Sequence, residues 1–162
     1  MKTIIISGSS RSDGDTDKLV KQIQAIKGWP EISLLNYDIG HFDYDYKNKD
    51  DDFLPLVRGL IQGFDTFVFV TPVYWYTMSG RTKVFFDRLT DLLTIEKDLG
   101  RDLKGKNMMG LSVSIGNNLG SDFWKPFQNT ANYLNMNFLG GLHLVSNTKF
   151  QQELKEFLTT VD

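Results

Sequence analysis

Cysteine is absent from the 162 residues of this chain. The absence excludes disulfide bonds, thiolate nucleophiles, iron–sulfur clusters and zinc sites with cysteine ligands. A chain without cysteine fits a reducing compartment. We therefore expect the protein to be cytoplasmic.

An excess of charge of one sign is also lacking, because 18 lysines and arginines face 20 aspartates and glutamates, for a net charge of −2. Such a balance provides no broad positive field for nucleic acid or anionic lipid. Long hydrophobic runs are missing as well, since the first apolar run ends at Ser7-Gly8, too early for a signal-peptide core or a membrane span. We expect no nucleic-acid partner and no membrane insertion.

Histidine is scarce, and neither copy predicts a metal site or a catalytic residue. His41 lies in a polar stretch and is interpreted as a surface residue, while His143 falls inside an apolar run and is interpreted as a hydrogen-bonded structural residue. The acidic run 50–52 directly precedes a helical segment, where carboxylates favourably meet the helix dipole. No metal ligand set is therefore predicted.

Apolar runs with the character of strands alternate with segments of helical periodicity along the whole chain. The predicted strands are residues 3–6, 31–35, 66–70, 108–115 and 138–145. The predicted helices are residues 19–26, 53–64, 85–93, 124–134 and 150–161. Residues 37–52 show neither period and are expected to form an irregular excursion.

Five alternating β-α units predict an α/β fold, a doubly wound five-stranded parallel sheet with helices on both faces. The length suits a single domain over residues 1–162. We expect the strand order 2-1-3-4-5, in which a ligand binds beyond the carboxyl ends of the strands at the switch point. The loops after the first, third and fourth strands should then form the site.

The loop after the first strand, residues 7–16, is rich in hydroxyls and glycine and carries one arginine. Backbone N–H groups at a helix start, hydroxyl donors and a guanidinium together suit a phosphate, although the loop lacks the lysine of a P-loop. The alternative is an ordinary helix start with Asp15 or Thr16 as N-cap. Both interpretations remain open at this point.

The loop after the third strand contains the consecutive aromatics Tyr74, Trp75 and Tyr76, which suit a planar ring system because their faces are flat and their edges polar. It could instead cover the sheet edge or contact another subunit. The glycine- and asparagine-rich loop 114–120 after the fourth strand supplies flexible backbone with amide donors.

These motifs resemble the NAD(P)H-dependent FMN reductase family of flavodoxin-like flavoproteins, over nearly the whole chain. The first resemblance lies in Gly8-Ser9-Ser10-Arg11 followed by Gly14-Asp15-Thr16, and the second in 71–75, Ser79-Gly80 and 83–88. The resemblance implies FMN as cofactor. The implied cofactor-binding residues are Ser9, Arg11, Asp15 and Thr16 at the phosphate, Pro72, Val73, Tyr74 and Trp75 along the isoalloxazine, and Ser114, Ile115 and Gly116 at its pyrimidine side.

The same resemblance implies an oxidoreductase that passes a hydride from NADPH or NADH through FMN to a quinone or another small electron acceptor, without a protein acid or base. It also implies a homodimer or homotetramer. Asp15 stands where the family often has asparagine. With Asp13 and Asp17 it is expected to repel the FMN phosphate and weaken its binding.

Other functions remain open. A flavodoxin-type electron carrier would bind FMN but serve protein partners, and a flavin-free interaction module would keep the fold without the cofactor. A phosphoacceptor receiver domain would need an aspartate at the end of the third strand, where this chain has Thr71-Pro72.

Overall fold

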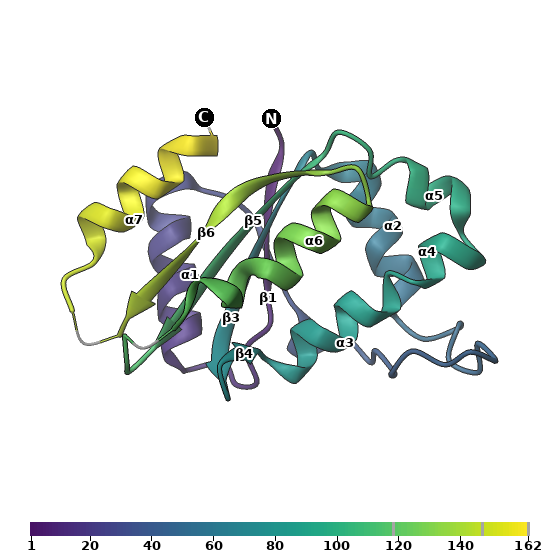
Figure 1. Ribbon diagram of the computed structural model, residues 1–162, viewed down its shortest axis with the longest axis horizontal. Helices are drawn as coiled ribbons and strands as arrows, with labels where there is room; N and C mark the ends of the chain where they lie inside the picture. The colour runs from purple at the N-terminus through teal and green to yellow at the C-terminus, as the bar shows by residue number, and fades with distance from the viewer. Residues whose placement is uncertain (118, 147, 162) are drawn as a thin grey trace.

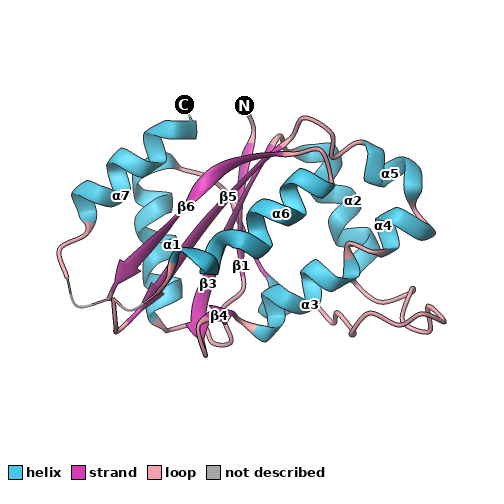
Figure 2. Ribbon diagram, viewed as in Figure 1, coloured by secondary structure: helices cyan, strands magenta, loops and turns pink. Residues whose placement is uncertain are grey.

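The computed structural model describes residues 1–117, 119–146 and 148–161. Of Val161 only the backbone is described. Predictions that involve Asn118, Asp162 or the side chain of Val161 lie outside the described residues. The described part is a single sheet layered between two sets of helices (Figures 1 and 2).

Parallel strands form the body of the sheet in the order β2-β1-β3-β5-β6. They are β1 (Thr3–Ser7), β2 (Glu31–Ser33), β3 (Thr66–Tyr74), β5 (Asn107–Ser114) and β6 (Asn137–Val145). The short β4 (Thr77–Met78) pairs antiparallel with the end of β3. With β4 set aside, the order is the predicted 2-1-3-4-5, so the flavodoxin-like doubly wound fold is confirmed.

The helices divide between the two faces of the sheet (Figure 1). One face carries α2 (Phe53–Gly63), α3 (Gly80–Arg88) and α6 (Lys125–Tyr133), and the other carries α1 (Asp15–Lys27) and α7 (Gln151–Leu158). Shorter elements are α4 (Asp91–Thr94), α5 (Lys97–Arg101) and the 3-10 turns η1 (Leu34–Asn36), η2 (Ser121–Trp124) and η3 (Thr159–Val161).

The central strands are continuous apolar runs because both of their faces are buried. Ile4 and Ile6 of β1 belong to the core beneath α2, α3 and α6, whereas Ile5 belongs to the core beneath α1 and α7. Neither face of β1 is open to water, which is why this strand shows no polar alternation in the sequence. None of the helices that the structure describes is long and apolar enough for a membrane crossing.

The predicted end of the third strand at Thr71-Pro72 is wrong, because β3 continues to Tyr74 and turns back into β4. Proline is tolerated here for a geometric reason. β1 is paired with β3 only as far as Val70, so Pro72 pairs with Val113 of β5 and has no strand on its other side.

The single helix predicted over residues 85–93 is also wrong. α3 ends at Arg88, the chain turns through 3-10-type hydrogen bonds from Leu89 N to Phe86 O and from Thr90 N to Asp87 O, and α4 begins at Asp91. The turn brings Asp91 back to Arg88, whose Nε lies 2.9 Å from Asp91 Oδ2. A buried ion pair thus replaces the regular continuation of the helix.

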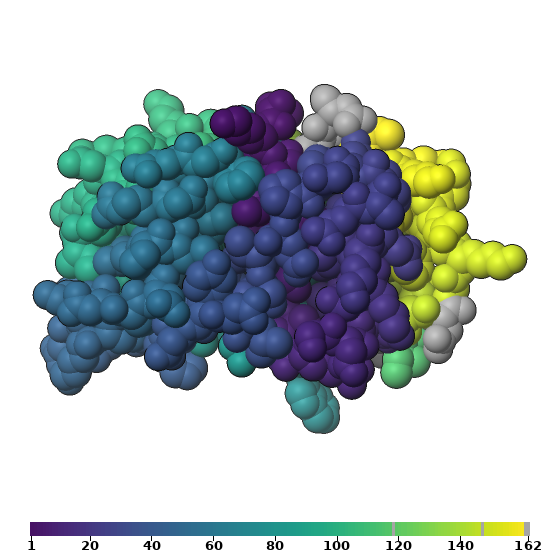
Figure 3. Space-filling model, turned by 180° about the vertical axis from the view of Figure 1, so that it is seen from behind, coloured from purple at the N-terminus to yellow at the C-terminus, as the bar shows by residue number. Residues whose placement is uncertain are grey.

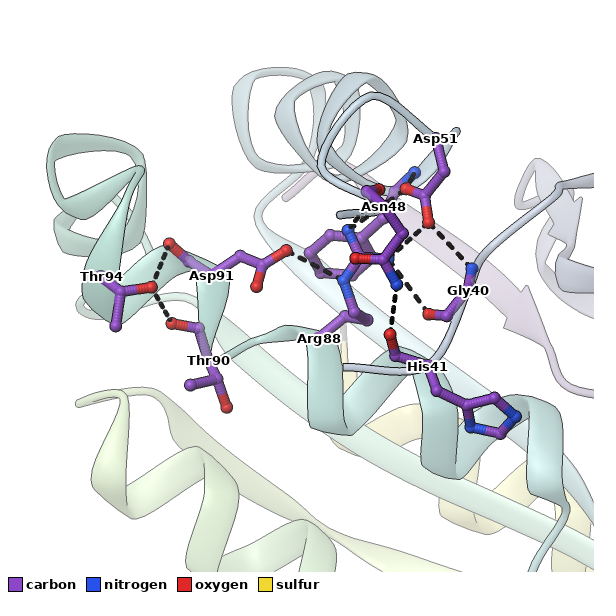
Figure 4. A network of polar contacts seen from close by, with 9 residues as sticks. Gly40, His41, Asn48, Asp51, Arg88, Thr90, Asp91 and Thr94 are labelled. Atoms are coloured by element: carbon purple, nitrogen blue, oxygen red, sulfur yellow. Dashed lines mark hydrogen bonds and ion pairs between the residues drawn. The ribbon is translucent and has the colours of Figure 1, made fainter. Parts of the chain in front are cut away.

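Arg88 is the centre of a buried polar network (Figure 4). Its side chain is 0% exposed, pairs with Asp51 as well as Asp91, donates to the carbonyl of Gly40, and lies over the ring of Phe53. Burial alone would raise the pKa of Asp51, but hydrogen bonds from Arg88 and backbone N–H groups outweigh it, and the pKa of Asp51 lies below its usual range. Asp51 of the run 50–52 therefore anchors the irregular excursion to α3. The interpretation of this run as acids at a helix start did not predict this contact.

Candidate functional site

A cleft of about 460 Å³ opens at the carboxyl edge of the sheet, where the predicted loops meet. Residues from the loop after β1, the end of β3 and the end of β5 surround it. The lining residues are Ser9, Arg11, Gly14, Asp15, Thr16, Pro72, Val73, Tyr74, Val113, Ser114 and Ile115. The topology thus brings together segments that lie far apart in the sequence.

Most of the residues that the sequence singled out line this cleft, and Trp75 and Gly116 do not. Trp75 is 93% exposed at the tip of the hairpin, and Gly116 is held away by hydrogen bonds described below. Gly14 and Val113 line the cleft but were missing from the predicted site. A signal for Val113 existed, since the last residues of a strand at the switch point face the ligand side.

Gly8 begins the first loop in a position that no larger residue could occupy. Its N–H donates to Val70 O, its carbonyl accepts from Ser79 Oγ, and a Cβ there would collide with the hydroxyl of Thr82. Ser79 also caps α3, because its side chain accepts from Thr82 N. The start of α3 is therefore packed directly onto the first loop.

The start of α1 differs from the ordinary capped helix that was one of the two interpretations. Gly14 is the N-cap, so Asp15 and Thr16 are not, and no side chain of the described residues accepts a hydrogen bond from its first turn. Uncapped N–H groups at a helix start form a natural anion site. Thr16 is buried beside them at 4% exposure, and Arg11 packs over Gly14.

Each of the three acids in the first loop and first helical turn has a basic partner. Asp13 lies 3.8 Å from Arg11 Nε, Asp15 lies 3.2 Å from Lys18 Nζ, and Asp17 lies 2.8 Å from Lys21 Nζ. The latter two pairs follow helical spacing. Their carboxylates are therefore compensated locally, which reduces the repulsion that the sequence suggested for a bound phosphate.

The hairpin between β3 and β4 is unusual in its turn residues. Trp75 and Tyr76 have φ values of 49° and 64°, the left-handed region that bulky side chains seldom adopt. The turn projects from the lower edge of the molecule in Figure 3. Tyr74, before the turn, faces the cleft and is 47% exposed, whereas Trp75 points to solvent.

His143 of β6 holds the loop after β5, and its prediction as a hydrogen-bonded structural residue is confirmed. It is paired across the sheet with Ser112, whose Oγ lies 2.8 Å from its Nδ1. Its Nε2 lies 3.1 Å from Gly116 O and 3.2 Å from Ser114 Oγ. His41, in contrast, is exposed and its ring points away from the Arg88 network (Figure 4).

Comparisons with known proteins agree with this architecture. The model of the NADPH-dependent FMN reductase family matches residues 1–151. The chain therefore belongs to this family. With the family come FMN as the cofactor and a reduced nicotinamide nucleotide as the electron donor, so the predicted resemblance, cofactor and oxidoreductase class are confirmed.

Among individual relatives, the chain is 28% identical over 152 residues to YwqN of Bacillus subtilis strain 168, which bears the name of an NAD(P)H-dependent FMN-containing oxidoreductase. The match covers 86% of this chain and 82% of YwqN. Its fold is also similar to that of several solved structures, at lower sequence identity.

The solved structure of a B. subtilis protein named Trp repressor binding protein superposes with a TM-score of 0.76 at 22% identity and covers 99% of both chains. An NADPH-quinone reductase of P. pentosaceus gives a TM-score of 0.69 at 16% identity, over 99% of this chain and 95% of that one. These likenesses support the fold.

Proposed function

We propose that the chain holds FMN in the carboxyl-edge cleft and passes electrons from NAD(P)H to a quinone or another small electron acceptor. The observation that carries the proposal is the convergence of the three loops around one hollow of about 460 Å³. The alternatives are a flavodoxin-type electron carrier and a flavin-free interaction module.

The first loop fits a phosphate group. The uncapped start of α1 offers backbone N–H donors, Thr16 and Ser9 place hydroxyls at the cleft, and Arg11 brings a positive charge to it. Ser9 Oγ donates to Arg11 O at 2.7 Å and accepts from Arg11 N at 3.3 Å, so its hydroxyl is already engaged in holding the shape of the loop. We infer that Ser9 shapes this cradle while Arg11 and Thr16 bind the anion.

The opposite part of the cleft fits a flat ring. Pro72, Val73 and Tyr74 present an apolar wall, and Ser114 and Ile115 face them from the end of β5. Bound FMN supplies the redox chemistry, in which a hydride from NAD(P)H is taken up and two electrons are delivered to the acceptor. The side chains bind and orient the ring and exclude water, and none of them needs to act as an acid or base.

The proposal also covers the small electron acceptor and the oligomeric state of the protein. Tyr74, Trp75, Tyr76 and Ile115 form an exposed apolar rim beside the cleft, with Trp75 at 93% and Ile115 at 78% exposure. Such a rim suits contact with an aromatic acceptor or with a second copy of the chain. We propose a homodimer or homotetramer in the cytoplasm, which sedimentation equilibrium and cell fractionation test.

The first experiment is the visible absorption spectrum of the purified protein before and after FMN is added and the excess removed. We expect a bound-flavin spectrum, bleaching by NADPH or NADH, and turnover with a panel of quinones. A protein that binds no FMN would support the flavin-free module. A protein that binds FMN but reduces no small acceptor would support an electron carrier.

A further inference from the structure

A groove separate from the flavin cleft runs across the face of the molecule that carries α6. It consists of two adjoining hollows, one of about 330 Å³ between α6 and the turn from α3 to α4, and one of about 320 Å³ between the end of α6 and the helices α4 and α5. Leu93, Tyr133 and Leu134 line both hollows. Figure 1 shows this face, where α6 (green) lies beside α3 and α4 (teal). No residue that the structure describes lines both this groove and the flavin cleft.

The hollow beside the turn from α3 to α4 is mainly apolar. Phe86, Leu89 and Leu134 are buried residues of the core that reach its surface here. Leu93 and Tyr133 also line this hollow but are 40% and 73% exposed. Exposed apolar surface of this kind gains free energy when another apolar group removes it from water. The hollow therefore suits an apolar ligand or an apolar part of one.

The hollow beside α5 is basic. Lys97, Arg101 and Lys104 line it, and no acid does among the residues that the structure describes. Lys97 and Lys104 form no ion pair within the described part of the chain. Arg101 pairs with Asp98, but both side chains are exposed, so this pair is weak and can give way to another anion. The end of the groove thus carries positive charge that the protein does not compensate.

An apolar hollow joined to a basic one fits an anion with a single apolar chain. The two volumes lie within the range of small-molecule pockets, roughly 300–1,000 Å³. Hollows of this size suit an alkyl chain better than a helix of a partner protein, whose diameter with side chains is about 10–12 Å. The fork of the Arg101 guanidinium matches a carboxylate, and the apolar stems of the two lysines can lie along the chain while their ammonium groups meet the charge.

We propose that this groove binds a free fatty acid, with its alkyl chain in the hollow between α3, α4 and α6 and its carboxylate at Lys97, Arg101 and Lys104. Leu93 and Tyr133, which line both hollows, cover the part of the chain next to the carboxylate. The inference goes beyond the proposed flavin chemistry and does not depend on it, because the groove and the cleft are lined by different residues.

The test uses decanoate, butanoate and decyltrimethylammonium as probes, each below the concentration at which it forms micelles. They are titrated calorimetrically into protein saturated with FMN, so that the cleft is filled. We expect decanoate to bind at least tenfold more tightly than butanoate, which lacks most of the chain, and than the ammonium probe, which has the opposite charge. Failure of decanoate to bind, or equal affinity for decanoate and the ammonium probe, would overturn the proposal. A failure of the proposed function appears separately, as a lack of FMN binding.

A double variant tests the basic end of the groove. Lys97→Met combined with Lys104→Met should weaken decanoate at least tenfold, because two charge-assisted contacts are lost. The matched control combines Lys49→Met with Lys125→Met, which removes the same charge from exposed positions outside the groove. The control should keep its affinity for decanoate. Equal losses in the two double variants would show that only net charge matters and would refute the site.

Tyr133→Ser tests the apolar wall. It should weaken decanoate about three- to tenfold and leave the weak binding of butanoate unchanged, because only the longer chain reaches the ring. Tyr44→Ser is the control, since it removes another exposed tyrosine that does not line the groove. Sedimentation equilibrium of the same variants examines the competing occupant, a second copy of the chain. If Tyr133→Ser dissociates an oligomer and leaves decanoate binding unchanged, the groove is a contact between copies and the proposal falls.

Discussion

The Nε2 atom of His143 lies 3.1 Å from the carbonyl oxygen of Gly116. Gly116 directly follows Ser114 and Ile115, which line the proposed flavin cleft. A carbonyl oxygen can only accept, so Nε2 carries the hydrogen, and in the neutral ring Nδ1 accepts from Ser112 Oγ. Ser114 Oγ donates to the same carbonyl at 2.9 Å. Two donors thus turn this carbonyl toward the sheet and fix the loop that carries Ser114 and Ile115.

His143→Gln and His143→Asn should separate these two contacts. Glutamine keeps an N–H near the position of Nε2 and should retain most of the affinity for FMN. Asparagine keeps only a group near Nδ1 and should weaken FMN about three- to tenfold, the value of one hydrogen bond. Quenching of flavin fluorescence measures the FMN affinity of both variants. Equal affinities in the two variants would contradict a role for the Gly116 contact.

Gly8→Ala should lower both the stability and the affinity for FMN. The added methyl group meets the hydroxyl of Thr82 and pushes the start of α3 away from the first loop, at a cost of about 1–3 kcal/mol. Gly59→Ala is the matched control, because it lies inside α2 with open space around its Cβ position. It should stabilise by about 0.5–1 kcal/mol in urea denaturation and leave FMN binding unchanged.

Arg88→Met should be strongly destabilising. It leaves the carboxylates of Asp51 and Asp91 without their partner, and breaking a buried pair in this way costs about 3–5 kcal/mol. Arg101→Met removes an arginine whose ion pair with Asp98 is exposed and should change stability by less than about 0.5 kcal/mol. Urea denaturation compares them, and similar losses in both would contradict the special role of the buried pair.

Asp51 and Glu31 should respond to pH in opposite ways. The pKa of Asp51 is lowered on folding, so its pairing stabilises the protein above the unfolded pKa of about 3.9 and is lost as the pH falls through the lower, folded pKa. Burial first, and then the charge of Asp17, raise the pKa of Glu31, so its ionised form is destabilising near pH 7 and the penalty is relieved on acidification.

Asp51→Asn should therefore lower the free energy of unfolding at pH 7, and Glu31→Gln should raise it. Both differences from the unmodified protein should shrink as the pH approaches about 3, where both carboxyls are protonated in the unfolded chain. Urea denaturation at several pH values measures this. A difference for either variant that keeps its size down to pH 3 would show that charge is not its cause.

Replacing Trp75-Tyr76 by Asn-Gly should stabilise the hairpin. Asparagine and glycine accept the left-handed conformation of this turn, and relief of the present φ values of 49° and 64° should add about 1–2 kcal/mol. If the aromatic rim serves the acceptor, quinone turnover at saturating FMN should fall at the same time. Tyr44→Asn, at another exposed aromatic, is the control and should alter neither quantity.

The sequence predicted the layered fold well because β1, β3 and β5 are continuous apolar runs that only a doubly buried parallel sheet explains. It failed where tertiary contacts override local pattern. Leu92 and Leu93 keep the helical spacing of α3, but the buried pair of Arg88 with Asp91 bends the chain before them. Pro72 was predicted to end the strand because the sequence does not reveal that β1 stops pairing with β3 at Val70. Without a strand on that side, the missing N–H of Pro72 costs no ladder hydrogen bond.

The candidate site was predictable at the level of loops, since topology alone decides which loops meet. Which side chains face the cleft was not, because the tight turn sends Trp75 outward while Tyr74 faces inward. The partner of Asp15 could have been recognised, since Lys18 follows at helical spacing. Because this pair compensates the charge of Asp15, the repulsion at the phosphate is smaller than the three acids alone predict.

The anchoring of the excursion by Arg88 has a consequence for the order of events in folding. Residues 37–52 contain no helix or strand, and the arginine that holds Asp51 lies 37 positions further along the chain. The excursion can take its shape only after α3 has docked against β3, so it should be the last part of this face to become protected from hydrogen exchange and, in the Arg88 variant, the first to be cut by a protease.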